Sequence, residues 1–562
     1  MDHHTHATDV LIAGAGPVGL TAASELRRRG VRCRIVDRLP ARLPYAKAVG
    51  VQPRTLELWD RNGLVRQALD AAVPMLGQLT YVNGVAQPRT DLVLPPEVPY
   101  GFAALPQYET ERILEAFLGR FGTGIERGTE LVSFTQDAGG VTSLLRTPSG
   151  TREEVRSRFL VGCDGAHSTV RKGLGLDFGG GALPEAYMLA DVEVDWDLPH
   201  GYGVRATHRD ADGRTDDLLV CIPLPGRGRY RMSMLVPPGL SADGAAGGDG
   251  TSGAAADDDG VAHGPESGRA PALPDVQAAL DRLSPQPATA SALRWASVFR
   301  ISHRIVDRYG RGRVFVAGDA AHIHPPTGAQ GMNTGIQDAW NLAWKLALAV
   351  DGAAAPALLD SYDAERRPVG REVVGRTLRH AAEGVQADPA DPAVLMMREA
   401  QLLVSYRGSP IVGPPQGEDG AAGPRPGDRA PDCGGLTGPI TAHPRRLFDL
   451  LRDRDHVLVL YGAGPPTGGP DAVRAFEELA RVAAARTGGR TTAFAVLAPD
   501  APDDPGAALP VHRDAQGEFA RLYAVDRPTA FVVRPDGHLA ARLGPPTAQD
   551  LSAALAATFD GP

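Results

Sequence analysis

Cysteine is scarce in this chain, which has four such residues among 562. Cys33, Cys163, Cys221 and Cys433 lie far apart, and none forms a CxxC pair or shows metal-ligand spacing. This pattern excludes a disulfide framework and provides no candidate metal site. The sequence instead predicts buried thiols in a reducing compartment.

Long apolar runs are also lacking. No uninterrupted stretch approaches the roughly 20 apolar residues that a membrane span needs. The first residues, MDHHTHATDV, contain neither the basic segment nor the apolar segment of a secretory signal. The prediction is a cytoplasmic protein with no membrane partner.

Basic residues are not in excess. The chain has 58 Lys and Arg against 67 Asp and Glu, a net charge of −9, and no Lys/Arg-rich run. Nucleic acid is therefore not an expected partner. A content of 43% hydrophobic and 22% charged residues is that of a globular protein, and the length predicts several domains.

A glycine-rich turn follows the first β-like run, residues 9–13. It is GAGPVG, at residues 14–19, and it leads into a helix-like segment to Arg29. Its three glycines are typical of a tight turn, a close approach of backbone to pyrophosphate, and a helix–strand contact. A second strand, residues 31–36, ends at an acid placed to bind an adenosine ribose. The predicted dinucleotide-binding residues here are Gly14, Gly16, Pro17, Val18, Gly19, Asp37 and Arg38.

A second segment, residues 313–348, combines a strand, an acid, a stiff loop and a helix. The strand Val314–Ala317 precedes Asp319, and an acid just past a strand end is typical of ligand sites in open α/β sheets. A Pro-Pro loop then leads to a helix that begins near Gly331, whose free N–H groups favour an anion. The combination predicts a cofactor with sugar hydroxyls at one end and a reducible ring at the other.

A third strand-then-acid element lies between these two. The strand-like run at residues 159–162 precedes Asp164, and a helix bearing Arg171 follows. Acids at Asp164 and Asp319 are what a long extended cofactor would require. Lys47 and Arg54 either face the cofactor or a substrate anion, or are solvated charges at helix ends; the sequence leaves both readings open.

The ordered motifs GAGPVG, CDGAHSTVR, GDAAHIHPPTGAQGMN and YDAERRP extend over about residues 9–379. Together they resemble the FAD-dependent aromatic hydroxylases, the single-component class A flavoprotein monooxygenases, and in particular those that tailor polycyclic polyketides. The chain from about Arg425 resembles the thioredoxin-like C-terminal domain of phenol hydroxylases, with Arg527–Thr529 like a cis-proline turn. No CxxC follows the predicted strand that ends at Tyr461, so thiol–disulfide chemistry is not expected there.

The resemblance implies an α/β architecture. A Rossmann-like FAD-binding domain is interleaved with a β-sheet substrate domain and followed by a thioredoxin-like α/β domain. The expected FAD-binding domain is residues 1–75, 101–183 and 290–390. The expected substrate domain is residues 76–100 and 184–289, including a disordered Gly/Ala/Asp-rich loop at 241–270. A linker at 408–435 would join these to the C-terminal domain, 436–562.

The resemblance also implies roles for individual residues. Gln107 is expected near the ribityl and phosphate groups, Asp319 with Gly318 at the ribityl chain, and Asp164 at a site for both FAD and a nicotinamide nucleotide. Residues expected to border the isoalloxazine ring are Pro326, Gly331, Met332 and Asn333. Lys47 stands where relatives commonly carry Arg, so a point charge replaces a bidentate fork. Arg54 is the one catalytic candidate, near the flavin or a substrate oxygen.

The implied activity needs FAD, NAD(P)H as a transient reductant, and O2. A C4a-hydroperoxyflavin would pass oxygen to a phenolic, polycyclic aromatic small molecule, in a protein that is a monomer or homodimer. Baeyer–Villiger oxygen insertion on the same scaffold stays open, as does a non-catalytic flavin-binding role. A flavin-dependent halogenase usually carries WxWxIP, which Trp295-Ala296-Ser297 does not supply.

Overall fold

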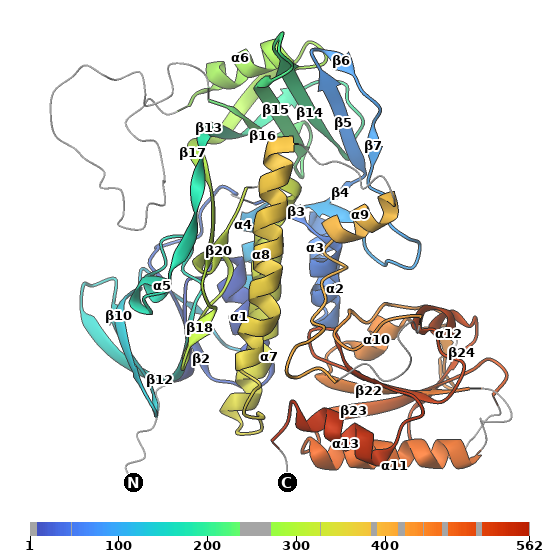
Figure 1. The fold of residues 1–562 in the computed structure, drawn as a ribbon. Helices are drawn as coiled ribbons and strands as arrows, with labels where there is room; N and C mark the ends of the chain where they lie inside the picture. The colour runs from blue at the N-terminus through green and yellow to red at the C-terminus, as the bar shows by residue number, and fades with distance from the viewer. Residues whose placement is uncertain are drawn as a thin grey trace.

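The computed structural model describes residues 8–46, 48–236, 271–325, 327–383, 391–413, 422–441, 443–463, 470–501 and 508–560. Lys47, Pro326 and the 241–270 segment, for which predictions were made, lie outside the described residues. Figure 1 shows three parts: a lower layered domain, an upper β-sheet, and a C-terminal domain beside the lower domain. The predicted α/β fold class is confirmed.

The main sheet of the lower domain contains parallel strands whose carboxyl ends lie along one edge. β1 (Thr8–Ala13) is entirely buried and pairs in parallel with β2 (Cys33–Asp37) and β12 (Arg152–Gly162). β19 (Val314–Val316) extends the same parallel arrangement from β12. Val36, Ala13, Gly162 and Val316 are consecutive register partners across these four strands. The loops after the strands, which carry the predicted glycines and acids, therefore meet at one edge.

Helices and short strands complete this domain. Its central helices, α1 (Pro17–Arg28) and α7 (Gly331–Val350), contact each other. The smaller helices are α2 (Pro53–Arg61), α3 (Val65–Ala71), α4 (Gln107–Gly119) and α5 (Thr169–Gly173). The remaining strands of the main sheet are β9 (Ile125–Arg127), β10 (Glu130–Asp137), β11 (Gly140–Arg146) and β18 (Gly310–Arg311). A separate small sheet contains β3 (Gly50–Val51), β4 (Val73–Met75) and β8 (Phe102–Ala104).

The upper sheet has nine strands in the order β20-β17-β13-β16-β15-β14-β5-β6, with β7 paired to β5. β13 (Phe178–Asp195) and β17 (Thr289–Val306) are 18 residues each and form an antiparallel ribbon that joins the two domains. β17 was expected in the FAD-binding domain from residue 290, but it pairs with β13 in the upper sheet. The other strands are β5 (Gly77–Val82), β6 (Val85–Ala86), β7 (Thr90–Asp91), β14 (Tyr202–Arg209), β15 (Thr215–Pro223), β16 (Arg229–Leu235) and β20 (His322–Ile323).

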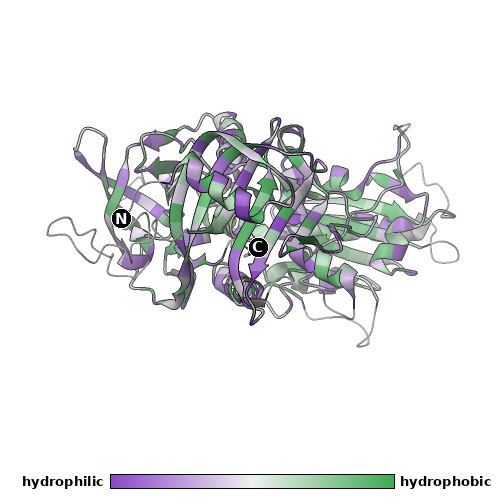
Figure 2. Ribbon diagram, turned by 90° about the horizontal axis from the view of Figure 1, so that it is seen from above, coloured by the Kyte–Doolittle hydropathy of each residue, from purple (hydrophilic) through white to green (hydrophobic). Residues whose placement is uncertain are grey.

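The two faces of the upper sheet differ in composition. One face is apolar and packs under α6 (Leu273–Leu283). Met188, Ala190, Val204, Leu219, Cys221, Met232 and Met234 are on this face. Side chains alternate along each strand, so residues such as Leu189 and Arg231 face the other way. This alternation is visible as mixed colours along the strands in Figure 2.

The long helix α8 (Asp360–Glu383) runs through the middle of the molecule, from the side of the C-terminal domain up to the upper sheet (Figure 1). It contains Pro368 and the predicted YDAERRP motif. In its first two turns, the side chains of Ser361, Tyr362, Glu365 and Arg366 are buried and face the protein interior. α9 (Pro392–Glu399) follows it and is capped by the Asp391 carboxylate. α8 contacts the C-terminal domain through the ion pair of Glu365 with Arg534.

The C-terminal domain has a six-stranded sheet in the order β21-β24-β23-β22-β25-β26. β22 (His456–Gly462) is parallel to β23 (Thr491–Leu497) and antiparallel to β25 (Thr529–Val533). The other strands are β21 (Leu436–Thr437), β24 (Val511–Asp514) and β26 (Leu539–Leu543). The helices are α10 (Leu447–Leu451), α11 (Pro470–Arg486), α12 (Glu518–Tyr523) and α13 (Ala548–Ala556). The thioredoxin-like assignment stays a prediction.

Two predictions for the C-terminal half are wrong. The cis peptide bond found in the described residues joins Gly544 to Pro545, not Arg527 to Pro528. The described parts of the 408–435 linker are not a spacer, because Ile411, Ala430 and Cys433 are buried in the core of the C-terminal domain. Although this stretch is rich in Pro and Gly, its apolar side chains pack into that core.

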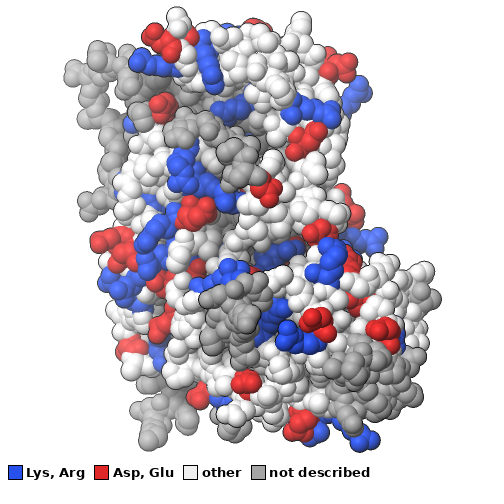
Figure 3. Space-filling view, turned by 45° about the vertical axis from the view of Figure 1, so that its right-hand side comes forward, with Lys and Arg blue, Asp and Glu red and all other residues white. Residues whose placement is uncertain are grey.

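The distribution of surface charges and the state of the cysteines agree with the amino-acid composition. Basic and acidic side chains are intermingled over the face that Figure 3 shows. All four cysteines are free. Among the described residues, no helix is long and apolar enough to cross a membrane.

Candidate cofactor and substrate site

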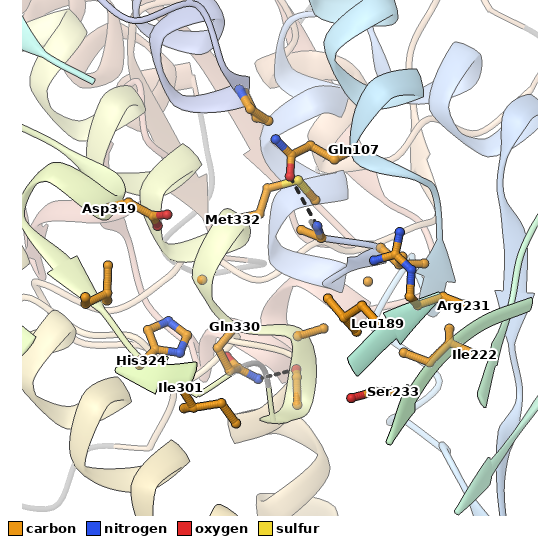
Figure 4. A pocket seen from close by; sticks show the side chains of 18 of the residues that line it. Gln107, Leu189, Ile222, Arg231, Ser233, Ile301, Asp319, His324, Gln330 and Met332 are labelled. Atoms are coloured by element: carbon orange, nitrogen blue, oxygen red, sulfur yellow. Dashed lines mark hydrogen bonds between the residues drawn. The ribbon is translucent and has the colours of Figure 1, made fainter. Parts of the chain in front are cut away.

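A single cavity of about 1700 Å³ extends from the loops at the strand ends to the inner face of the upper sheet. Sites for one drug-sized ligand are roughly 300–1,000 Å³. The cavity therefore has room for an extended cofactor and a second ligand. In Figure 4 Met332 and Gln330 lie between the side chains of the upper sheet and those of Asp319 and His324.

The GAGPVG turn forms one end of this cavity. Gly14 has φ +98°, and a Cβ there would lie 2.3 Å from the Cys163 carbonyl oxygen. A Cβ on Gly19 would lie 1.9 Å from the Gly14 carbonyl oxygen, so this glycine permits the contact of helix and turn. Gly14, Gly16, Pro17 and Val18 line the cavity, whereas Gly19 lies behind them. α1 begins at Pro17 with no side-chain cap, which leaves its first N–H groups for an anion.

Asp37 stands next to this turn, as predicted. Its carboxylate accepts hydrogen bonds from the Ala15 N–H at 2.7 Å and the Leu39 N–H at 2.8 Å. Each oxygen keeps capacity to accept a further bond from a ligand hydroxyl. Arg38 also lines the cavity. The strand-then-acid spacing therefore brings an oriented carboxylate to the edge of the glycine turn.

Gln107, at the start of α4, is held by two contacts. Its Oε1 accepts from the Ala48 N–H at 3.1 Å, and its Nε2 donates to Glu111 at 2.9 Å. Burial raises the pKa of Glu111, which lines the same cavity. The sequence did not single out Glu111, because a glutamate within a helix carries no distinguishing signal.

Asp164 and Asp319 are placed differently in the cavity. Asp164 accepts hydrogen bonds from the Ser168 hydroxyl at 2.5 Å and the Val170 N–H at 3.2 Å, and so stabilises the turn before α5. Burial raises the pKa of Asp164. Asp319 lies in a 3₁₀ turn between the buried residues Gly318 and Ala320, with its own side chain exposed in the cavity.

Asp338 on α7 supports that turn and was missed in the sequence. Its carboxylate accepts from the Gly318 N–H at 3.2 Å, from His322 Nε2 at 2.8 Å and from Arg366 Nε at 2.7 Å. Burial opposes ionisation of Asp338, but the Arg366 and His322 charges lower its pKa below the usual value. YDAERRP, recognised as a motif, thus supplies the arginine that fixes the loop bearing Asp319.

Asn333 fixes the beginning of α7. Its Oδ1 accepts from the Gln52 N–H at 2.9 Å and the Thr55 hydroxyl at 2.7 Å, and its Nδ2 donates to the Gly50 and Ala329 carbonyls. Its side chain is thus engaged by protein groups and does not line the cavity. Gly331 and Met332 do line it. α7 begins without a side-chain cap, so its positive end is available to a ligand in the cavity.

His324 is a second residue that the sequence did not single out. It lines the cavity, and its Nδ1 lies 2.9 Å from the Pro325 carbonyl oxygen. Burial and the neighbouring His322 lower the pKa of His324 to about 4. The ring is therefore neutral near pH 7, with Nδ1 donating to Pro325 and Nε2 an acceptor. No hydrogen-bond partner of Nε2 is found among the described residues.

The prediction that Arg54 faces the flavin or a substrate oxygen is wrong. Arg54 is 2% exposed and does not line the cavity. Its guanidinium forms an ion pair with Glu57 at 2.9 Å and donates to the Asp536 carbonyl of the C-terminal domain. The helix-end position suggested a ligand, but a domain from the far end of the sequence covers this site.

A family model for the FAD binding domain matches residues 7–246 and 262–377 of this chain. The chain belongs to the FAD-binding domain family. The turn at Gly14, the acceptor at Asp37 and the uncapped helix starts fit the phosphates, ribose and ring of FAD, and all of them border one cavity of about 1700 Å³. FAD is thus the cofactor of this family member.

Named relatives are similar over nearly the whole chain. The 6-methylpretetramide 4-monooxygenase of Streptomyces rimosus is 35% identical over 95% of this chain and 90% of its own length. The anhydrotetracycline monooxygenase of Streptomyces rimosus is 34% identical over 99% of both chains. The crystal structure of a ternary complex of aklavinone-11 hydroxylase with FAD and aklavinone matches with a TM-score of 0.73 and 26% identity, over 99% of both chains. The FAD-binding family member thus resembles flavoprotein monooxygenases along its full length.

Proposed function

We propose that this protein is an FAD-dependent monooxygenase that uses NAD(P)H and O2 to hydroxylate a phenolic, polycyclic aromatic substrate. The observation that carries the proposal is the continuity of one cavity. It extends from the dinucleotide-binding loops, past the start of α7, to the face of the upper sheet that lies opposite α6. A flavin and an aromatic ring held in such a cavity would be in direct contact.

The relatives support the substrate class. Two of them are monooxygenases named for pretetramide and tetracycline compounds, and the structural match contains aklavinone. The wall of the cavity suits such flat molecules because it is formed by Leu189, Leu218, Val220, Ile222 and Leu235, all on strands of one sheet. These apolar side chains can bury the face of a planar ring system away from water.

The residues of the chain then have separable tasks. When bound, FAD supplies the redox chemistry, taking electrons from NAD(P)H and activating O2. The uncapped start of α7 would stabilise negative charge on the ring system beside it. The apolar wall would exclude water, and the neutral His324 ring would accept a proton or hydrogen bond at Nε2.

The decisive experiment is mass spectrometry of products formed from a panel of polycyclic phenols under ¹⁸O2. Ring hydroxylation adds one labelled oxygen and keeps the carbon skeleton, whereas Baeyer–Villiger insertion gives a labelled lactone. NAD(P)H oxidation that no aromatic compound stimulates, with FAD bound, would identify a non-catalytic flavin protein. Light scattering would test the expected monomer or homodimer, and fractionation the expected cytoplasmic location.

A further inference from the structure

Arg231, on the cavity face of β16, is a buried cation with an unused donor. It is 3% exposed and lines the cavity. Its Nε donates to Asp191 Oδ1 at 2.5 Å, but its Nη2 is buried without a hydrogen-bond partner. A buried guanidinium N–H left unpaired is costly, so a native structure that keeps one needs a reason.

Residues of the neighbouring strands hold the Arg231 guanidinium in place. Asp191 on β13 is the register partner of both Arg231 and Trp295 of β17. The Arg231 guanidinium also lies 5.4 Å from the centre of the Trp295 ring, which stacks on Tyr45 at 4.5 Å. Arg231 lines the cavity, where Figure 4 shows it beside Leu189 and Ile222.

The surrounding wall carries more positive than negative charge. Among the described cavity-lining residues of the upper sheet between 183 and 235, the charged ones are Glu185, Arg205, Arg209, Arg214 and Arg231. Even with the Asp191 carboxylate included, cations outnumber anions. Burial lowers the pKa of Arg205, and nearby Arg209 lowers it further. An anionic ligand would relieve this excess of positive charge.

We infer that Arg231 binds an ionised oxygen of the substrate, and hence that the substrate is an acidic polycyclic aromatic molecule. The acidic group is a carboxylate or an enolate next to a carbonyl, since both present oxygens that a guanidinium fork accepts. Leu189 and Ile222, on the flanking strands, hold the ring system against the sheet. This inference rests on the proposed function and specifies which aromatic compounds it concerns.

The test compares an acid with its neutral isostere on the FAD-loaded protein. Binding of 3-hydroxy-2-naphthoic acid and 3-hydroxy-2-naphthamide is measured at pH 7 by flavin absorbance changes and calorimetry, and 2-acetyl-1,3-indandione serves as the enolate probe. The wild-type protein is expected to bind the acid or the enolate at least about tenfold more tightly than the amide. The probe with the larger preference identifies the acidic group.

Variants assign the preference to a residue. Arg231→Gln should abolish the preference, and Arg231→Lys should keep only part of it, because a point charge lacks the fork. If Arg231→Gln fails to fold, the double variant Arg231→Gln/Asp191→Asn leaves no unpaired carboxylate and should show the same loss. Arg294→Gln is the matched control. Arg294 pairs with Glu193, which lies on β13 like Asp191, but Arg294 does not line the cavity.

Equal affinities for acid, enolate and amide in the wild type would overturn the inference. Loss of the preference in Arg205→Gln but not in Arg231→Gln would also overturn it, by assigning the anion to the other arginine. The proposed function fails separately, by the absence of bound FAD or of aromatic-stimulated NAD(P)H oxidation. These readouts do not depend on the acid-to-amide ratio.

Discussion

Asn333 shows how much one side chain contributes at the residue scale. Its amide joins the loop before α7 to β3 and α2 through four hydrogen bonds, and three of the partners, Gly50, Gln52 and Ala329, line the cavity. An asparagine with all its groups engaged cannot rotate without losing several bonds at once. It therefore holds the start of α7, at Gly331 and Met332, in position.

Asn333→Ala is expected to lower the free energy of unfolding by about 3 kcal/mol, because buried backbone groups at Gln52 and Gly50 lose their partners. The same change should weaken FAD retention. Urea unfolding and the ratio of flavin to protein after gel filtration measure the two effects. Gln87→Ala, which removes one exposed side-chain bond to the Val85 carbonyl, is the control. Unchanged stability and flavin content in Asn333→Ala would contradict the structural role.

The residues of the site differ in how far the sequence predicts them. Gly14, Asp37 and Asp319 follow strand ends at short, fixed spacing, so a local pattern is enough to single them out, and all three line the cavity. Asp338 and Asn333 act through partners that are distant in sequence or depend on loop geometry, and no local pattern shows such contacts. Arg54 was misassigned for the same reason, since its partner Asp536 belongs to the C-terminal domain.

Whole elements were more predictable than their connections. The helix α7 begins at Gly331, where the sequence predicts a helix start, and the strand β22 ends at Gly462, next to the predicted strand end at Tyr461. The pairing of β17 along β13 was not predictable from either strand alone, because register depends on the partner. The domain boundary at residue 290 was therefore placed inside a ribbon that the structure shows to be continuous.

The strand β22 begins with a histidine that the fold keeps neutral. His456 is 2% exposed, and its ring lies against Trp344 of α7 at 5.3 Å and Phe559 at 4.8 Å. Burial lowers the pKa of His456 to about 3, far below its usual 6.5. Because the folded-state pKa is depressed, protonation favours the unfolded chain as the pH falls below 6.5, and the loss continues until about pH 3.

His456→Phe should therefore remove an acid-sensitive group from the contact between β22 and α7. The free energy of unfolding of the variant minus that of the wild type should be about 3 kcal/mol larger at pH 4 than at pH 7. Urea unfolding of both proteins at the two pH values measures the difference. His200→Gln, at an exposed position, should show no such pH-dependent gain. Equal pH dependence in His456→Phe and the wild type would rule out a neutral buried His456.

At the scale of the whole molecule, the C-terminal domain is attached through buried charges. Arg534 donates to Glu365 of α8 at 2.7 and 2.8 Å and to Asp536 at 2.5 Å, and Lys345 of α7 pairs with the same glutamate at 2.8 Å. All four side chains are at most 4% exposed. Burial opposes ionisation of Glu365, yet the charges of Arg534 and Lys345 lower its pKa well below the usual value. Both domains therefore share one ionic core.

Sharing this core should make the two domains unfold together. Arg534→Met leaves Glu365 and Asp536 without their main cation, and breaking such a buried group is expected to cost about 3–5 kcal/mol. Calorimetry should then resolve two transitions where the wild type shows one, because the C-terminal domain keeps its own apolar core. Arg490→Met is the matched control: it breaks the interdomain pair with Asp351, which is partly exposed at both partners and contributes less than about 1 kcal/mol. If Arg534→Met unfolded in one transition at the wild-type temperature, the attachment would depend on apolar contacts alone, and the buried charges would only set the orientation of the domain.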